Sequence, residues 1–456
     1  MNWELFRTHA HQVIDDICDY YTQLETRPVK STVTPGYLQK LLPFQAPQVG
    51  ESFAAVRDDL FKHIMPGISH WQHPSFFAFY PSNSSPAGML AEMYSNMFNC
   101  VGFNWMCSPA YTELETIVLD WLCKALKLST DFLSNGKGCG VIQGTASEAV
   151  LVAMLAARKM KLDQGIPLSK LCFYCSDQTH ACCKKASTIG LAQLRVVKTD
   201  QYGSLQHHEL EMAIAKDIEQ GFVPFFVVGT YGTTTSGAID DIEGIGRICE
   251  KYDIWFHIDA AYAGSFLLLD EFYCPTDKCE SFNMNCHKFM LVNFDCSPLW
   301  IKDRSKVIDT LSVAAPYYRN VNSEKGLVTD FRDLQLPLGR RFRSLKLWFV
   351  MRLYGIEKLQ EHVLTHLNYA IQIENKIKSE PQLQLIKRDF ALVTFTHVDE
   401  SKTRALYDLI QSENVYITCS KLNDKEILRF VSGSPLTLQK HVNDFWAVVR
   451  DKVNMV

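Results

Sequence analysis

Apolar residues recur at helical spacing near the N-terminus and then give way to links that contain proline. The helical positions are Val13, Ile14, Ile17, Tyr20 and Tyr21, and the links are TRPVK, TPGY and LPFQAPQ. Residues 1–84 are therefore expected to form a helical arm. Such an arm has too small a core to fold alone, so its apolar residues must cover another surface, such as a second subunit.

Between residues 85 and 345, short apolar runs alternate with longer amphipathic segments, which predicts βαβ units around a mostly parallel sheet. The predicted strands are 138–143, 171–176, 194–199, 225–232, 254–262 and 289–294. We expect this segment to form a large α/β domain. From 346 to 456, a long helix, short strands at 392–398, 415–420 and 427–433, and a closing helix predict a small α+β domain.

The composition of the chain excludes several classes of protein. The chain has 456 residues, 47% hydrophobic content and a formal charge of −4, and its basic residues are scattered. It offers no basic patch for nucleic acid or for an anionic membrane surface, so neither partner is expected. No apolar stretch approaches the ~20 residues of a spanning helix, and the first residues lack the order of a signal peptide. A cytoplasmic protein is expected.

Apart from the adjacent Cys182 and Cys183, the 15 cysteines lie singly, mostly inside apolar patterns, as buried free thiols do. Cys172 and Cys175 have CxxC spacing, but they fall in the strand-like run LCFYCS without a second pair or a nearby pair of histidines. Core packing is favoured over zinc binding. We expect no disulfide framework and no metal site.

The segment GVIQGTASEA ends an apolar strand and opens a helix with small residues from Gly144 to Ser147. The free N–H groups and positive dipole end of a helix attract a phosphate, and small side chains let it approach the backbone. The same residues suit an ordinary helix cap equally well. Both interpretations stay open on this segment alone.

Two further segments carry candidate chemistry. In IWFHIDAAYAGS a buried strand ends at Asp259, where α/β sheets bind ligands, although a lone Asp more often caps a turn. In SFNMNCHKFMLVNFDCS, Lys288 lies among apolar residues, and a desolvated amine suits Schiff-base chemistry, although most lysines are solvated. Pyridoxal-5′-phosphate (PLP) offers a phosphate to Ser147, a ring nitrogen to Asp259 and an aldehyde to Lys288.

Eight motifs occur in the order found in group II PLP-dependent decarboxylases: HPSFFAFYP, SPAYTELE, GTASEA, SDQTH, GTTTSG, HIDAAYAGS, NCHKFMLVNFDCS and PLGRRFRSLKLWFV. Over nearly its whole length the sequence resembles this family, and within it the aromatic-L-amino-acid decarboxylases. The resemblance implies PLP-dependent transferase fold type I, similar to aspartate aminotransferase, and conversion of an aromatic L-amino acid to an arylalkylamine and CO2. A Rossmann dehydrogenase is not indicated, because no GxGxxG follows a strand.

The resemblance also implies contacts with the cofactor. Lys288 matches the lysine that holds PLP as a Schiff base, His180 the histidine that stacks on its ring, and Asp259 the partner of the ring nitrogen. The other predicted cofactor-binding residues are Ala146, Ser147, Thr234, Ala261, Asn285 and His287. His180 is also expected to take part in catalysis by relaying a proton.

A loop after the lysine, APYYRNVNSEKG, bears on the outcome of the reaction. The resemblance implies that a loop tyrosine returns a proton to the substrate carbon after CO2 leaves, whereas relatives with phenylalanine there are aldehyde synthases. Tyr318, two residues after Pro316, is the better match, and the adjacent Tyr317 is the alternative. A tyrosine at this place favours the decarboxylase.

Aromatic residues predict a pocket for an aromatic side chain. The resemblance places these residues at the substrate: Trp71, Phe79, Tyr80, Pro81, Ser82, Phe103, Leu338 and Gly339. Gly339 stands where plant relatives have serine for phenolic substrates and glycine for indolic ones, so room for a tryptophan-type ring is implied. Animal enzymes with glycine accept catechols, so tryptophan, phenylalanine, tyrosine and dihydroxyphenylalanine all stay open.

Members of this family share each active site across a twofold interface, and the arm at 1–84 fits that arrangement, so a homodimer is expected. Two other functions stay open. An aromatic aldehyde synthase would release aldehyde and hydrogen peroxide. A catalytically silent PLP-fold protein would bind or regulate, although intact Lys288, Asp259 and His180 argue against it.

Overall fold

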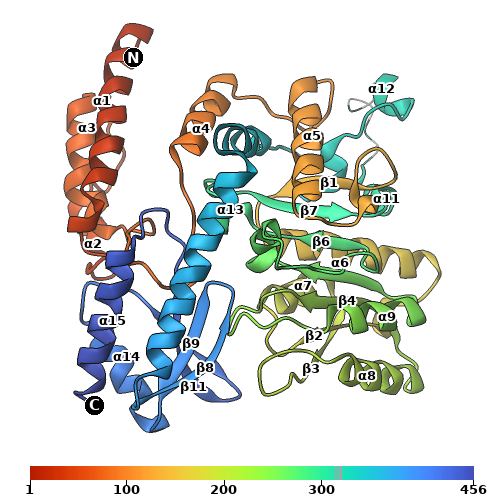
Figure 1. The fold of residues 1–456 in the computed structure, drawn as a ribbon. Coiled ribbons are helices and arrows are strands. Elements are labelled where there is room, and N and C mark those ends of the chain that lie inside the picture. The colour runs from red at the N-terminus through yellow and green to blue at the C-terminus, as the bar shows by residue number, and fades with distance from the viewer. Residues whose placement is uncertain (314, 316–317, 319–320) are drawn as a thin grey trace.

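A seven-stranded sheet forms the centre of the protein, in a computed structural model that describes residues 1–313, 315, 318 and 321–456. Its strand order is β1-β7-β6-β5-β4-β2-β3 (Figure 1). Strands β2 to β6 run parallel, and β7 runs antiparallel to β6 and β1. The strands are β1 (Cys139–Gln143), β2 (Leu171–Ser176), β3 (Gln193–Val197), β4 (Val223–Thr230), β5 (Trp255–Asp259), β6 (Ser281–Asn283) and β7 (Ser297–Ile301).

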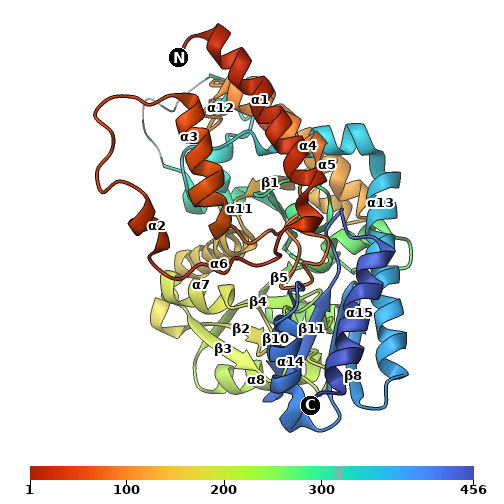
Figure 2. The ribbon, with the colours of Figure 1, turned by 90° about the vertical axis from the view of Figure 1, so that its left-hand side faces the viewer.

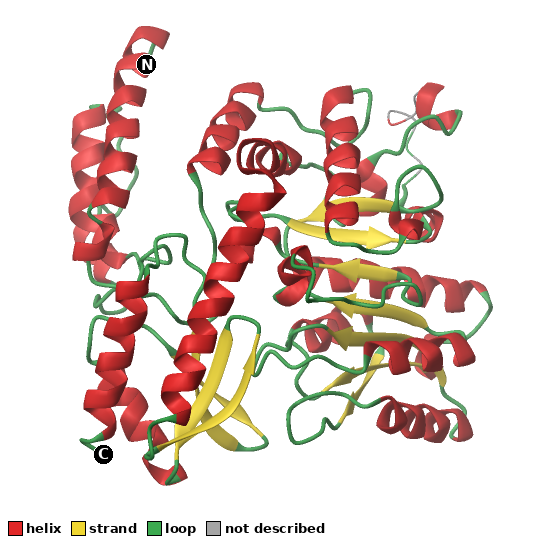
Figure 3. Ribbon diagram, viewed as in Figure 1, coloured by secondary structure: helices red, strands yellow, loops and turns green. Residues whose placement is uncertain are grey.

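Helices cover both faces of this sheet, because its central strands are apolar on both sides (Figure 3). On β4, Phe226 and Val228 join a core cluster with α6 and α7, whereas Val227 between them joins a cluster with α8 and α9. The helices are α5 (Pro109–Ala125), α6 (Ala146–Asp163), α7 (Cys182–Gly190), α8 (His207–Glu219), α9 (Ile242–Tyr252), α10 (Cys286–Phe289), α11 (Arg304–Leu311) and α12 (Val321–Glu324). The predicted α/β architecture is confirmed.

The run 289–294 is not a strand, so this part of the prediction is wrong. Phe289 ends α10, and Leu291 has a φ of +57°, which turns the backbone where an extended run was expected. The sheet contains β6 and β7 instead. Both escape a search for apolar runs, because β6 has three residues and β7 begins with Ser-Pro, which usually marks a turn.

A second sheet has four antiparallel strands in the order β10-β11-β9-β8. Its strands are β8 (Leu383–Asp389), β9 (Leu392–His397), β10 (Thr418–Leu422) and β11 (Lys425–Val431), and its helices are α13 (Arg343–Lys378), α14 (Thr403–Gln411) and α15 (Gln439–Val453). Helix α13 breaks at Gly355, which has a φ of +68°. The predicted strands at 392–398 and 427–433 are confirmed, β10 starts later than predicted, and β8 was not predicted.

The N-terminal helices are α1 (Trp3–Thr22), α2 (Tyr37–Leu41), α3 (Phe53–Asp59) and α4 (Pro86–Phe98). Helices α1 and α3 lie side by side and project away from both sheets (Figures 1 and 2). They are joined by the ion pair of Arg57 with Asp16 and by the stacking of His9 on Phe53, with ring centroids 4.2 Å apart. Every residue of α1 keeps some exposure to solvent, so this pair has little core of its own. Of the helices that the structure describes, none combines the length and apolar composition needed to span a membrane.

Candidate active site

Lys288 lines a cavity of about 230 Å³ at the carboxyl ends of β4 and β5. Its short helix α10 is fixed by Cys286 and Phe289, which are buried in the core. The Lys288 Nζ lies 4.8 Å from the centre of the Tyr80 ring. Burial lowers the pKa of Lys288 to about 8, although the charge of Asp259 opposes this shift. A useful fraction of the amine is therefore neutral near pH 7, as attack on an aldehyde requires.

Asp259 faces the same cavity from the end of β5. Only 4% of the residue is exposed. Its Oδ1 accepts hydrogen bonds from the Ala261 N–H at 3.0 Å and from the Asn283 side-chain amide at 3.2 Å. The carboxylate is therefore held in one orientation at the carboxyl end of β5, which is where an open α/β sheet is expected to bind its ligand.

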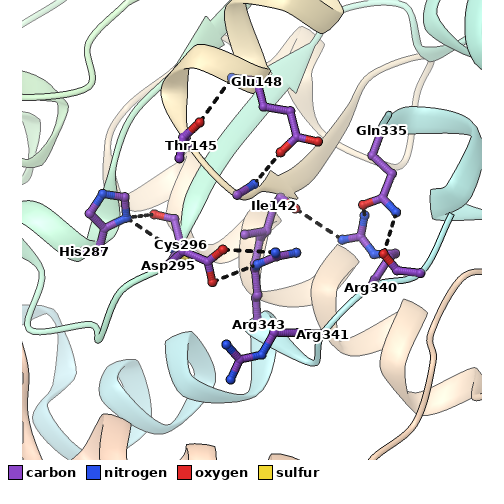
Figure 4. Close-up of polar contacts among 12 residues, drawn as sticks. Ile142, Thr145, Glu148, His287, Asp295, Cys296, Gln335, Arg340, Arg341 and Arg343 are labelled. Carbon is purple, nitrogen blue, oxygen red and sulfur yellow. Dashed lines mark hydrogen bonds and ion pairs between the residues drawn. The ribbon is translucent and has the colours of Figure 1, made fainter. Parts of the chain in front are cut away.

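The start of α6 forms another wall of this cavity, through Thr145, Ala146 and Ser147. Thr145 Oγ1 accepts from the Glu148 N–H at 3.3 Å, and Glu148 Oε2 accepts from the Gly144 N–H at 2.9 Å (Figure 4). The helix is thus capped in the ordinary way, and its start also lines the cavity. The first N–H groups of a helix have no partner inside it, which suits an anion.

Two histidines line the cavity, and their surroundings shift their pKa values in opposite directions. The Cys182 N–H donates to His180 Nδ1 at 3.2 Å, and contact with the Cys182 side chain is the largest cause that raises the pKa of His180. The Cys296 N–H donates to His287 Nδ1 at 3.1 Å (Figure 4). Burial lowers the pKa of His287 to about 4, so this ring is neutral at physiological pH.

A wider cavity of about 570 Å³ adjoins the first and shares six lining residues with it: Tyr80, His180, Thr234, His287, Lys288 and Phe294. Its other lining residues are Trp71, Phe79, Pro81, Ser82 and Arg429. Trp71 and Phe79 stack with their ring centroids 5.6 Å apart. Phe79 has a φ of +54°, which is strained for a bulky residue and which positions its ring at the cavity. An aromatic wall therefore stands beside the amine.

Tyr80 contributes its ring to the cavity but not a free hydroxyl. Its Oη donates to the Thr233 carbonyl at 2.9 Å, and its ring stacks on Tyr262 with centroids 3.9 Å apart. Burial raises the pKa of Tyr80 to about 12, so the hydroxyl stays protonated. This side chain is therefore an apolar wall anchored to the main chain.

Four predicted residues do not line either cavity of the single chain: Phe103, Tyr318, Leu338 and Gly339. Phe103 and Tyr318 contact one another, with ring centroids 5.9 Å apart. The Arg332 guanidinium carbon lies 4.2 Å from the centre of the Tyr318 ring. Tyr317, the alternative loop tyrosine, and Pro316 lie outside the described residues. The predicted site is thus divided into two groups within one chain.

The segment that carries Gly339 is held by side chains rather than by regular secondary structure. The Gln335 amide donates to the carbonyls of Pro337, Leu338 and Gly339. Gln335 Oε1 in turn accepts from Arg340 Nη1 at 2.7 Å (Figure 4). The position of Gly339 therefore depends on a buried polar network.

Asn83 connects the lysine segment with two distant parts of the chain. Its N–H donates to the His287 carbonyl at 2.6 Å, and its Oδ1 accepts from the Leu291 N–H at 3.0 Å. Its side-chain amide donates to the Gly433 carbonyl at 2.8 Å. Segments from the beginning, middle and end of the sequence therefore meet at Lys288.

Sequence reasoning missed several lining residues: Thr230, Gly232, Tyr262, Phe294 and Arg429. The sequence does mark Arg429 as unusual, because it is a charged residue within the apolar run ILRFVSG. A buried charge is costly unless it has polar partners. Arg429 Nε donates to the Thr235 carbonyl at 2.9 Å and its Nη1 to Thr418 Oγ1 at 2.8 Å. Its buried Nη2 has no hydrogen-bond partner among the described residues.

The residues at this site fit PLP. The start of α6 suits a phosphate, the Asp259 carboxylate suits a protonated ring nitrogen, and the Lys288 amine suits an aldehyde. All three line one cavity of about 230 Å³. Few other ligands need this combination of an anion site, a carboxylate and a partly neutral amine.

Comparison with known proteins agrees with this chemistry. Residues 35–398 match the pyridoxal-dependent decarboxylase conserved domain. The chain is 47% identical to tyrosine decarboxylase 2 of Narcissus pseudonarcissus, over 100% of this chain and 95% of that protein. It is 45% identical to phenylacetaldehyde synthase of Arabidopsis thaliana, over 100% and 97%. The crystal structure of Catharanthus roseus tryptophan decarboxylase in complex with L-tryptophan matches with a TM-score of 0.95 and 36% identity, over 100% of this chain and 99% of that one. As its motifs and its lysine cavity indicated, the chain belongs to the family of pyridoxal-dependent decarboxylases.

Proposed function

We propose that the protein removes the carboxylate of an aromatic L-amino acid as CO2 and releases the corresponding arylalkylamine, with Lys288 as the residue that binds PLP. The observation that carries this proposal is the single cavity shared by Lys288, Asp259 and the start of α6. The aromatic wall beside it and the tyrosine and tryptophan decarboxylases among the relatives support an aromatic substrate.

Each group of the cofactor would have its own residues. Lys288 Nζ would bind the aldehyde, Asp259 the ring nitrogen, and the ring of His180 one face of the pyridine. Ala146 and Ser147 would hold the phosphate, with further contacts from Asn285 and His287. Ala261 would lie under the ring, and Thr234 would offer a hydroxyl to the cofactor. When bound, PLP supplies an electron sink for the electron pair released as the Cα–carboxylate bond breaks.

The surrounding side chains would orient the substrate and exclude water. The stacked rings of Trp71 and Phe79 would hold the aromatic side chain, and orientation selects which bond at Cα breaks. Arg429 lines the wider cavity, and its positive charge would attract the carboxylate of the substrate. Tyr318 would deliver the proton that replaces CO2 at Cα, with His180 assisting.

We also propose a homodimer in which the Tyr318 loop and the Gly339 segment of one subunit complete the cavity of the other. An apolar cavity of about 440 Å³ on the arm supports this, since it is lined by Val13, Ile17, Phe53, Leu60 and other residues of α1, α3 and the segment after α3. In this arrangement the arm at 1–84 packs on the second subunit, while 85–345 and 346–456 form the large and small domains. A cytoplasmic location stays a prediction.

Complementation tests the shared site. Lys288→Ala and Tyr318→Phe variants are unfolded and refolded together, so that mixed dimers form. If the loop acts across the interface, one site of each mixed dimer has both Lys288 and Tyr318, and amine formation recovers. If the loop acts within its own chain, no site has both residues and the mixture makes no more amine than the Tyr318→Phe variant alone.

The reaction itself is tested with the purified holoprotein. Borohydride reduction should leave the pyridoxyl label on Lys288, and a label on another residue or on none would refute the site. Incubation with tryptophan, phenylalanine, tyrosine and dihydroxyphenylalanine should release amine and CO2. Aldehyde with hydrogen peroxide would instead identify an aldehyde synthase, and no turnover of any of the four would support the silent binding protein.

A further inference from the structure

Behind Asp259, five buried side chains form one continuous row of hydrogen bonds between two strands. Trp255, His257 and Asp259 come from β5, and Ser281 and Asn283 come from β6. Side chains two residues apart on a strand point to the same face, and the parallel register pairs His257 with Ser281 and Asp259 with Asn283. None of the five is more than 5% exposed. We call this row the β5–β6 relay.

The contacts of the relay alternate between the strands. Trp255 Nε1 lies 2.8 Å from Ser281 Oγ, which lies 2.8 Å from His257 Nδ1. His257 Nε2 lies 2.7 Å from Asn283 Oδ1, and Asn283 Nδ2 lies 3.2 Å from Asp259 Oδ1. Each distance is that of a normal hydrogen bond, so the row is unbroken from the indole to the carboxylate.

The two ends of the relay fix the direction of every bond in it. An indole N–H can only donate, and a carboxylate can only accept. Because Asp259 can only accept, Asn283 turns its NH2 group toward Asp259 and its oxygen toward His257 Nε2, which must carry a proton. The Ser281 hydroxyl accepts from Trp255 and gives its own proton to His257 Nδ1. Burial lowers the pKa of His257 to about 4, so the ring is neutral and its single proton is on Nε2.

We propose that the β5–β6 relay positions the Asp259 carboxylate for the ring nitrogen of the cofactor, with His257 and Asn283 as positioning residues. This rests on the proposed function, in which Asp259 meets that nitrogen. Among the described residues, both hydrogen bonds to the carboxylate end on Oδ1, which leaves Oδ2 for the ligand. A neutral His257 orients the amide without adding a positive charge that would compete with the ring nitrogen for Asp259.

A purely structural role for these residues makes a different prediction. Buried polar groups always need partners, and a relay that served only the core would affect folding and every ligand equally. A relay that serves Asp259 affects only ligands that carry the ring nitrogen. The two roles are therefore separated by changing one atom of the ligand.

The experiment compares two ligands on the apoprotein by absorbance titration: PLP and an analogue in which the ring nitrogen is replaced by C–H. Wild-type apoprotein should bind PLP more tightly than the analogue. In His257→Phe, which keeps a flat ring but loses both nitrogens, the Kd for PLP should rise about tenfold. The Kd for the analogue should stay within about twofold of the wild-type value.

His366→Phe is the matched control, since His366 is also buried and its Nδ1 bonds a serine hydroxyl, Ser432 Oγ, at 2.7 Å. It should leave the ratio of the Kd for the analogue to the Kd for PLP unchanged. Ser281→Ala removes the hydroxyl that donates to His257 Nδ1 and should lower this ratio, as His257→Phe does. This variant decides the test if His257→Phe does not fold.

Equal weakening of both ligands in His257→Phe and Ser281→Ala, or no weakening of either, would overturn the proposed relay. In that event wild-type protein that binds PLP at Lys288 still supports the proposed function. If wild-type apoprotein shows no preference for PLP over the analogue, the role of Asp259 itself fails.

Discussion

Arg340 and Glu115 form an ion pair in which neither side chain has any exposed surface. Glu115 also accepts from the Ile142 N–H at 2.7 Å. Arg340 also donates to Gln335 Oε1 (Figure 4). An intact buried ion pair adds little to the stability of the fold, because the cost of removing both charges from water offsets their attraction. Removing one partner is strongly destabilising, because the other charge then stays buried without compensation. The pair therefore ties β1 and α5 to the segment that carries Gly339.

The first prediction concerns this pair. Arg340→Met should lower the free energy of unfolding by about 3–5 kcal/mol, because the charge of Glu115 would remain buried without its partner. The shift of the urea midpoint measures this loss. Glu115→Met with Arg340→Met should recover part of it. A single variant as stable as the wild type would show that water reaches this pair.

The second prediction concerns Gly339. Among the described residues, a Cβ at this position would meet only Val101 Cγ1 within 4 Å, at 3.4 Å, so the described fold does not require glycine here. Gly339→Ser should leave the melting temperature within about 2 °C of the wild type. The ratio of kcat/KM for tryptophan to that for tyrosine should fall about tenfold, because the side chain takes room from the larger ring.

Gly264→Ser provides the contrast for that variant. A Cβ at Gly264 would lie 2.7 Å from the Met284 Cβ, so the same change should lower the melting temperature. If Gly339→Ser lost stability as Gly264→Ser does, or if the substrate ratio did not move, Gly339 would not determine specificity.

The third prediction concerns Tyr318. Phenylalanine keeps the ring contacts with Phe103 and Arg332 and removes only the hydroxyl. Tyr318→Phe should lower the ratio of amine to aldehyde at least about tenfold, because the proton donor to Cα is lost. Amine, aldehyde and hydrogen peroxide are quantified together. Tyr317→Phe is the control, and a product shift in that variant alone would assign the role to Tyr317.

The fourth prediction follows from the pKa of Lys288, which burial lowers to about 8. Only the neutral amine attacks an aldehyde, so the neutral fraction falls about tenfold with each pH unit below the pKa. The rate at which apoprotein takes up PLP should therefore rise with pH and level off above about pH 8. Stopped-flow absorbance measures this rate. A profile that still rises toward pH 10 would indicate a solvated lysine.

Most strands of the large sheet were predictable, because buried parallel strands appear in the sequence as continuous apolar runs. The polar residues that could bind a ligand were predictable too, because they directly follow the carboxyl ends of these strands. Asp259 is an example, since its strand pattern ends on the residue that faces the cavity. The run 289–294 has the same composition as a strand, and only the tertiary turn at Leu291 shows otherwise. The charge inside the apolar run ILRFVSG marks Arg429 as unusual, but its partner Thr235 lies far away in the sequence, and no local pattern encodes that contact.

The three hydrogen bonds of Asn83 set a condition on how the protein is made. One of them reaches Gly433, near the end of the chain, and another holds the segment of the lysine. During translation the lysine leaves the ribosome long before Gly433 does. A message truncated before the last strand would yield a polypeptide without the Gly433 carbonyl that anchors Asn83 and without Arg429 of the cavity, so it should hold vitamin B6 less tightly than the finished chain.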